Sequence, residues 1–169
     1  MENYYSDQLK QVLTFSREEA ERLGNREIAP EHLVLSMLRI SESKAVTLLQ
    51  SLEVDLKLVK QSIEKEIRLD IITPNVSLAL SDDAERILKL VHLEARSLNE
   101  KVADTEHLLL SILKNGTGVV LDSLLAEGVS YDLVREKVVE RTDVRMGSVF
   151  SDEDDLEDEK PVTPTAKAT

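Results

Sequence analysis

The sequence contains no cysteine and no tryptophan, and aromatic residues make up only 3% of its 169 residues. Without cysteine, disulfide bonds and thiolate chemistry are excluded, which is consistent with a reducing compartment. Five glycines and four prolines are too few for the many turns that a fold of short strands requires. A core of Leu, Val, Ile and Ala with so few rings favours packed helices, so we expect an all-α protein.

The sequence also lacks an excess of basic residues and any long apolar run. Its net charge is −12, which would repel a nucleic-acid backbone or an anionic lipid surface. No stretch approaches the roughly 18 apolar residues of a membrane span. Residues 1–5 show neither the basic cluster nor the apolar run of a signal peptide. We therefore expect a cytoplasmic protein with no nucleic-acid or membrane partner.

The sequence contains two copies of one repeat, offset from each other by about 75 residues. The aligned positions share identical residues and include Ser6-Asp7 with Ser81-Asp82, Leu13 with Leu88, Glu19-Ala20 with Glu94-Ala95, Leu23 with Leu98, and Glu31-His32-Leu33 with Glu106-His107-Leu108. Length differences are confined to loops. So many matches in one register indicate an internal duplication.

Each copy predicts four helices. In the first copy, Ser6 is a good N-cap for a helix that Gly24 ends. The segment Glu31 to Ile40 is apolar nearly all round, as expected for the buried central helix of a bundle. A third, short helix follows, and a fourth covers 56–67 with Asp55 as its cap. The second copy repeats this scheme, which predicts an eight-helix pseudo-twofold bundle of two four-helix repeats.

The domain boundaries follow from changes in composition. We place repeat 1 at about 6–69, a linker at 70–80 and repeat 2 at about 81–143, together forming one domain over 1–145. Residues 151–169 carry seven acids against two lysines and little apolar bulk. Such a segment cannot offset its ordering entropy, so we expect 146–169 to be a flexible, disordered acidic linker. A folded domain that ends in a linker suggests that a larger part normally follows.

The search for catalytic or metal sites gives little. Glu31 and His32, like Glu106 and His107, are adjacent, so their side chains diverge by about 100° around a helix and cannot share one metal ion. The alternative is a structural role, in which each histidine is partly buried and hydrogen-bonded to the backbone. Residues 115–119 superficially suggest a phosphate loop but lack the Lys-Ser/Thr that must follow it, so a turn is expected. We expect no catalytic residue, metal or cofactor in this chain.

The repeated glutamates have two interpretations that spacing alone leaves open. Glu31 and Glu106 stand at the start of the central helix of each repeat, where a carboxylate is favoured by the helix dipole and by free amide groups. An exposed carboxylate at the mouth of a groove could equally accept a guanidinium in bidentate fashion. One residue could do both.

The doubled Glu-His-Leu helix resembles the Clp N-domain repeat. Its carriers are the segments Ile28 to Ser36 and Val102 to Ser111, and the likeness spans about residues 5–142. The form of the motifs and the acidic linker are most similar to ClpC-type AAA+ unfoldases. The resemblance implies a domain that recruits protein substrates and adaptors for a hexameric ATPase working with a ClpP-type peptidase. ATP and Mg would then bind in ATPase modules that lie outside this chain.

The same resemblance implies site residues. Relatives of the ClpC type bind phosphorylated arginine in some bacteria, with the guanidinium on the Glu of each Glu-His motif, here Glu31 and Glu106. The phosphate lies near the hydroxyl that opens the first helix of each repeat, here Ser6 and Ser81. The duplication predicts two equivalent grooves, each headed by a serine cap and a Glu-His pair. Ser in place of the usual Thr, and acids near both caps, depart from the family pattern.

Other functions remain open at this stage. The chain could be a stand-alone regulatory protein made only of Clp-like repeats, without an ATPase. It could come from a ClpA- or ClpB-type parent, because the repeat is shared among these ATPases. A stand-alone enzyme with an active site inside a helical bundle would need a convergent set of polar side chains, which the sequence does not offer. We expect the isolated chain to be a monomer or weak dimer.

Overall fold

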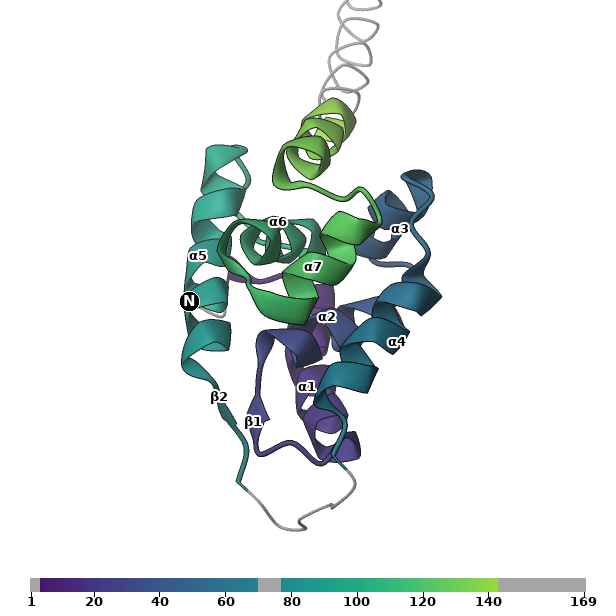
Figure 1. Ribbon diagram of the computed structural model, residues 1–169. Coiled ribbons are helices and arrows are strands. Elements are labelled where there is room, and N and C mark those ends of the chain that lie inside the picture. The colour runs from purple at the N-terminus through teal and green to yellow at the C-terminus, as the bar shows by residue number, and fades with distance from the viewer. Residues whose placement is uncertain (1–3, 70–76, 143–169) are drawn as a thin grey trace, which may run out of the picture. The chain divides into compact units, whose positions relative to one another are not determined.

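The computed structural model describes residues 4–69 and 77–142 (Figure 1). In repeat 1 the helices are α1 (Asp7–Arg22), α2 (Pro30–Arg39), α3 (Lys44–Ser51) and α4 (Leu56–Ile67). Repeat 2 contains α5 (Asp82–Ser97), α6 (Thr105–Asn115) and α7 (Gly118–Ala126), and residues 131–142 are helical as well. The expected all-α fold of eight helices is confirmed. The two short strands, β1 (Glu27–Ile28) and β2 (Ala79–Leu80), were not expected.

The chain divides into two compact units, residues 1–134 and 135–169, and the description below concerns the first. Residues 70–76 of the linker expected at 70–80, and the acidic segment at 146–169, lie outside the described residues. The domain boundary placed at 145 stays a prediction. Among the described residues no single helix is long and apolar enough to cross a membrane, and one bent pair, α6 with α7 at 106°, meets that criterion only when taken together.

The first helix of each repeat has the same kind of N-cap and the same kind of C-terminal end. The hydroxyls of Ser6 and Ser81 accept hydrogen bonds from the amides of Leu9 and Ala84, each at 3.1 Å, which confirms the predicted serine caps. At the other end the chain leaves the helix through a left-handed residue. That residue is Gly24 (φ 76°) after α1 and Asn99 (φ 62°) after α5, 75 positions later.

The helices α2 and α6 form the centre of the fold. Every residue from His32 to Met37 and from His107 to Leu113 is buried. Each helix starts with a capping box closed by its histidine. Nδ1 of His32 accepts from the amide of Ala29 at 2.8 Å, and Nδ1 of His107 accepts from the amide of Asp104 at 2.9 Å. Because Nδ1 is an acceptor, both rings are neutral and carry their proton on Nε2.

The two repeats are joined through the segments that precede their helices. Strand β1 pairs in parallel with β2, so that Ile28 lies opposite Leu80, and Tyr5 forms the matching bridge with Ala103. The Ser81 amide then donates to the Ile28 carbonyl at 2.9 Å, and the Ser6 amide donates to the Ala103 carbonyl at 2.8 Å. The start of each repeat's first helix is therefore bound to the other repeat, which gives the predicted pseudo-twofold arrangement.

The left-handed helix ends predict a matched pair of stability effects. Gly24→Ala places a Cβ at positive φ and should lower the free energy of unfolding by about 1 kcal/mol. Asn99→Gly removes the same penalty at the equivalent position and should leave stability unchanged or slightly higher. Urea denaturation of both variants measures the difference. Equal destabilisation by the two substitutions would contradict this account of the helix ends.

The buried histidines predict a loss of stability in mild acid. Burial lowers the pKa of His32 and of His107 to about 4. A base whose pKa is depressed on folding stabilises the fold above its unfolded pKa of about 6.5, and this contribution is lost as pH falls towards 4. At about 1.4 kcal/mol per pKa unit, each histidine accounts for roughly 3.5 kcal/mol at most.

Denaturation at a series of pH values should therefore show the free energy of unfolding falling between pH 6.5 and 4. In the double variant His32→Gln/His107→Gln the amide oxygen can still close each capping box, and no titrating group remains there. Its stability should depend less on pH over this interval, with each single variant intermediate. A double variant that keeps the wild-type pH dependence would show that these two rings are not the cause.

Candidate functional site

The strand pairing brings each serine cap next to the Glu-His helix of the other repeat. Ser81, at the start of α5, is bound to Ile28, two residues before the first turn of α2, where Glu31 lies. Ser6, at the start of α1, is bound to Ala103, and its side chain reaches Asp104, the N-cap of α6. The predicted site residues thus fall into two groups, each with one residue from either repeat, although the pocket beside Glu31 is not lined by Ser81. We call these two composite sites the Glu31 site (Glu31 with Ser81) and the Glu106 site (Glu106 with Ser6).

The Glu31 site is open to solvent and its histidine is fully bonded. Glu31 is partly exposed at the edge of a shallow pocket of about 420 Å³ between the end of α1 and the start of α2. Nε2 of His32 lies 2.7 Å from Oδ1 of Asn25, and the Asn25 amide donates to the carbonyl of Ile67 at 2.9 Å. These bonds leave Glu31 as the group at this helix start that faces the pocket.

The hydroxyl of Ser81 also keeps a free proton in this part of the structure. The hydroxyl accepts a hydrogen bond from the Ala84 amide, and it donates to no group among the described residues. Ala29, the N-cap of α2, has no polar side chain that could compete for that proton. A ligand oxygen could therefore accept a bond from Ser81 without displacing another group.

The Glu106 site is more enclosed, and its serine is bonded to a carboxylate. Oδ1 of Asp104 accepts from the Ser6 hydroxyl and from the Thr105 amide, each at 2.7 Å. Lys44 Nζ, from α3, lies 3.5 Å from the other oxygen of Asp104. Oε1 of Glu106 and Nε2 of His107 are buried and have no hydrogen-bond partner in the described structure. Burial raises the pKa of Glu106; the ammonium of Lys44 opposes this shift and the carboxylate of Asp104 adds to it.

The expectation of two equivalent grooves is therefore wrong. Asp104 occupies the position that Ala29 has in repeat 1, and its carboxylate takes up the Ser6 proton that a ligand oxygen would need. Glu100 likewise stands where repeat 1 has Asn25, so the histidine loses the amide that would bond to its Nε2. The backbone of the two sites is duplicated, but two side-chain differences change their charge and their free hydrogen-bonding capacity.

Neither site has the arrangement of a catalytic centre. Within residues 4–69 and 77–142, no three His, Asp or Glu side chains come together as a metal site. The sequence-based alternative for His32 and His107, buried rings bonded to backbone, is confirmed. Asn115 ends α6, and Gly116 and Thr117 form the turn into α7, which begins at Gly118. What the two sites offer is carboxylate and hydroxyl groups at helix starts, which suits binding of a cationic or hydrogen-bonding side chain.

Sequence reasoning missed a pair of buried glutamates on the outer helices. Glu19 of α1 is bonded by Arg22 at 2.7 Å and by Arg39 at 3.3 Å. Its equivalent in α5, Glu94, accepts from the Tyr131 hydroxyl at 2.6 Å and lies 3.9 Å from Lys114. Arg39 and Lys114 are themselves 75 positions apart. The signal was present in the aligned Glu-Ala pairs, and the role is to tie the outer helix to the central one.

Comparison with known proteins agrees with these features. The family model described as the Clp repeat (R) N-terminal domain matches residues 4–126 and again 79–167. The chain is 33% identical over 136 residues to the chaperone protein ClpB of Oceanobacillus iheyensis, and 29% identical over 136 residues to the negative regulator of genetic competence ClpC/MecB of Bacillus subtilis. In both comparisons 80% of the chain is covered, but only 17% of the relative.

Solved structures share the fold at low sequence identity. The N-domain of ClpV from Vibrio cholerae superposes with a TM-score of 0.70 at 16% identity and covers 82% of the chain and 84% of that structure. A complex of the ClpV N-domain with a VipB peptide gives a TM-score of 0.63 at 15% identity, covering 74% and 79%. The relatives carry both ClpB and ClpC names, so the likeness is to the N-terminal domain that they share. The chain belongs to the Clp repeat N-terminal domain family.

Proposed function

We propose that this chain is the substrate- and adaptor-recognition domain of an ATP-dependent Clp ATPase, which delivers bound proteins for unfolding and for degradation by a ClpP-type peptidase. The chain spans about a sixth of the length of the curated relatives it matches. ATP and Mg would bind to the ATPase modules of such a parent. A solved relative, the N-domain of ClpV, is described in complex with a peptide, which supports peptide recognition by this domain type.

The observation that carries the proposal is the Glu31 site. A partly exposed carboxylate lies at a helix start whose neighbouring polar groups are already bonded to one another. The free hydroxyl proton of Ser81 belongs to the adjoining helix start. A carboxylate and a hydroxyl donor at adjoining helix starts suit a guanidinium that carries an oxyanion, because the carboxylate pairs with the cation and the hydroxyl donates to the oxyanion. Phosphoarginine is the side chain with this chemistry.

At the Glu106 site the same ligand meets a different surface. The Ser6 proton is donated to Asp104, and the Asp104 carboxylate would face the phosphate. Lys44 compensates this charge only in part, because it is already paired with Asp104 at 3.5 Å. We therefore propose that phosphoarginine binds first at the Glu31 site and that Asp104 hinders binding at the Glu106 site.

Calorimetry with free phosphoarginine tests this assignment. The wild-type chain should bind about one ligand, and Glu31→Ala should weaken binding about tenfold or more because the bidentate acceptor is lost. Glu66→Ala, at an exposed position of α4, is the matched control and should bind normally. Asp104→Ala copies the residue of repeat 1 and should reveal a second, Glu106-dependent site. No heat at millimolar ligand, or unchanged binding by Glu31→Ala, would overturn the phosphoarginine assignment.

The broader recognition function is tested separately. Protein capture from native lysate by the 169-residue chain should fall in Glu31→Ala/Glu106→Ala and persist in Glu66→Ala, because the composite sites and not the net charge bind the cargo. Capture that is unchanged in the double variant would move recognition away from both sites. This result would stand whatever the outcome with free phosphoarginine.

The length of the gene distinguishes this function from the alternative, a stand-alone regulatory protein made of Clp repeats. An ATPase parent requires several hundred further codons with a P-loop motif, whereas a stand-alone protein requires none. If the chain belongs to such an ATPase, we propose a ClpC-type parent in the cytoplasm, because of the form of the two Glu-His motifs.

A further inference from the structure

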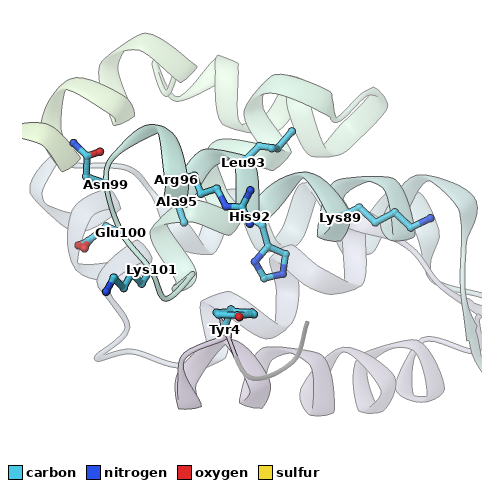
Figure 2. A pocket seen from close by; sticks show the side chains of 9 residues that line it. All are labelled: Tyr4, Lys89, His92, Leu93, Ala95, Arg96, Asn99, Glu100 and Lys101. Atoms are coloured by element: carbon cyan, nitrogen blue, oxygen red, sulfur yellow. The ribbon is translucent and has the colours of Figure 1, made fainter.

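A second pocket lies on the outer face of α5, away from the two composite sites. It has a volume of about 580 Å³ and is formed by the second half of α5, the turn that follows it and Tyr4 (Figure 2). Its lining includes three cationic residues, a histidine and two exposed apolar groups: Lys89, Arg96, Lys101, His92, Leu93 and Tyr4. Figure 2 shows the Tyr4 ring below His92, while Leu93 leaves α5 on the opposite side. We call this the α5 pocket.

The aromatic part of the α5 pocket is built by stacked rings. The ring of His92 stacks on Tyr5 with 4.9 Å between centroids and meets the edge of Tyr4 at 6.2 Å. Nε2 of His92 is buried and has no hydrogen-bond partner in the described structure. Burial lowers the pKa of His92, so its ring is neutral at pH 7 and adds an apolar wall rather than charge.

The cations of the α5 pocket are largely unpaired. Arg96 and Lys101 are exposed, and neither enters any of the ion pairs given for the described residues. Lys89 is bonded to Glu85 at 3.2 Å on the rim. Glu100 is the one carboxylate among the lining residues. In a chain of net charge −12, a pocket with two unpaired cations is a local reversal of sign.

The duplication shows that the fold does not require this surface. The positions of repeat 1 that correspond to Leu93 and Arg96 are Glu18 and Glu21, and Thr14 corresponds to Lys89. The twin helix α1 therefore has the same backbone with acids at two of these positions, whereas Arg17 and Arg26 stand at the positions of His92 and Lys101. A basic residue in the last turn of a helix is stabilised by the helix dipole. In α1 this residue is Arg22, and it is also paired with Glu19 and Glu64. Arg96 has no such partner.

We propose that the α5 pocket binds an acidic peptide segment of a partner protein, in which carboxylates flank one apolar side chain. The carboxylates pair with Arg96 and Lys101, and the apolar side chain packs against the exposed Tyr4 ring. Charge complementarity selects the ligand class, because these cations lack internal partners. A nucleic acid is the poorer candidate, since the net charge of −12 repels a long polyanion more than it repels a few carboxylates.

Fluorescence anisotropy with a labelled twelve-residue peptide of alternating acids and leucines tests the proposal on the 169-residue chain. Arg96→Glu/Lys101→Glu should weaken binding about tenfold or more. Affinity should fall with rising salt because exposed charge pairs are screened. The same peptide with Asn and Gln in place of its acids should bind poorly.

The matched control is Lys10→Glu/Lys57→Glu, which makes the same change in net charge at two exposed positions of α1 and α4. It should bind the acidic peptide as the wild type does. Equal weakening by the control would show that only overall charge matters, and tighter binding of single-stranded DNA than of the peptide would assign the pocket to nucleic acid. Either result overturns the proposal. Glu31→Ala/Glu106→Ala should keep full peptide binding, so this test is independent of the composite sites.

Discussion

The interaction on which the rest of the structure depends is the short backbone pairing between the repeats. The amides of Ser6 and Ser81 each donate to a carbonyl just before the Glu-His helix of the other copy. These bonds use polar groups that precede a helix and would otherwise need water or a side chain. They also determine which serine cap lies beside the start of which Glu-His helix.

Polar groups at the helix starts are organised before any ligand arrives. Nδ1 of each histidine accepts the capping hydrogen bond at the start of its own helix, and burial keeps the ring neutral. In repeat 1 this leaves Glu31 to face the pocket, whereas in repeat 2 one oxygen of Glu106 is itself buried. This explains why the Glu-His pair occurs as a unit: one residue builds the helix start, and the other uses the position that the first has made rigid.

Most of the helical framework could be predicted from sequence, because caps and apolar periodicity are local signals. Ser6, Asp55 and Ser81 cap the predicted helices, and the central helices are buried as their composition indicated. The exchange of helix starts between repeats was not predictable, since two-residue strands such as Glu27–Ile28 have no periodicity to detect. The inequality of the sites was visible as Ala29 against Asp104, but its meaning required knowing that Asp104 contacts Ser6 in the other repeat.

The exchange of helix starts also bears on how such a domain could arise. Each composite site takes one part from each copy, so a single repeat holds the two halves of a site but cannot bring them together within itself. Two identical repeats related by a twofold axis could do so, because in such a pair every contact is made twice. The two-copy chain thus has the geometry of a dimer joined into one polypeptide. Once joined, the halves were free to diverge, as Asp104 beside Ser6 and the basic outer face of α5 show.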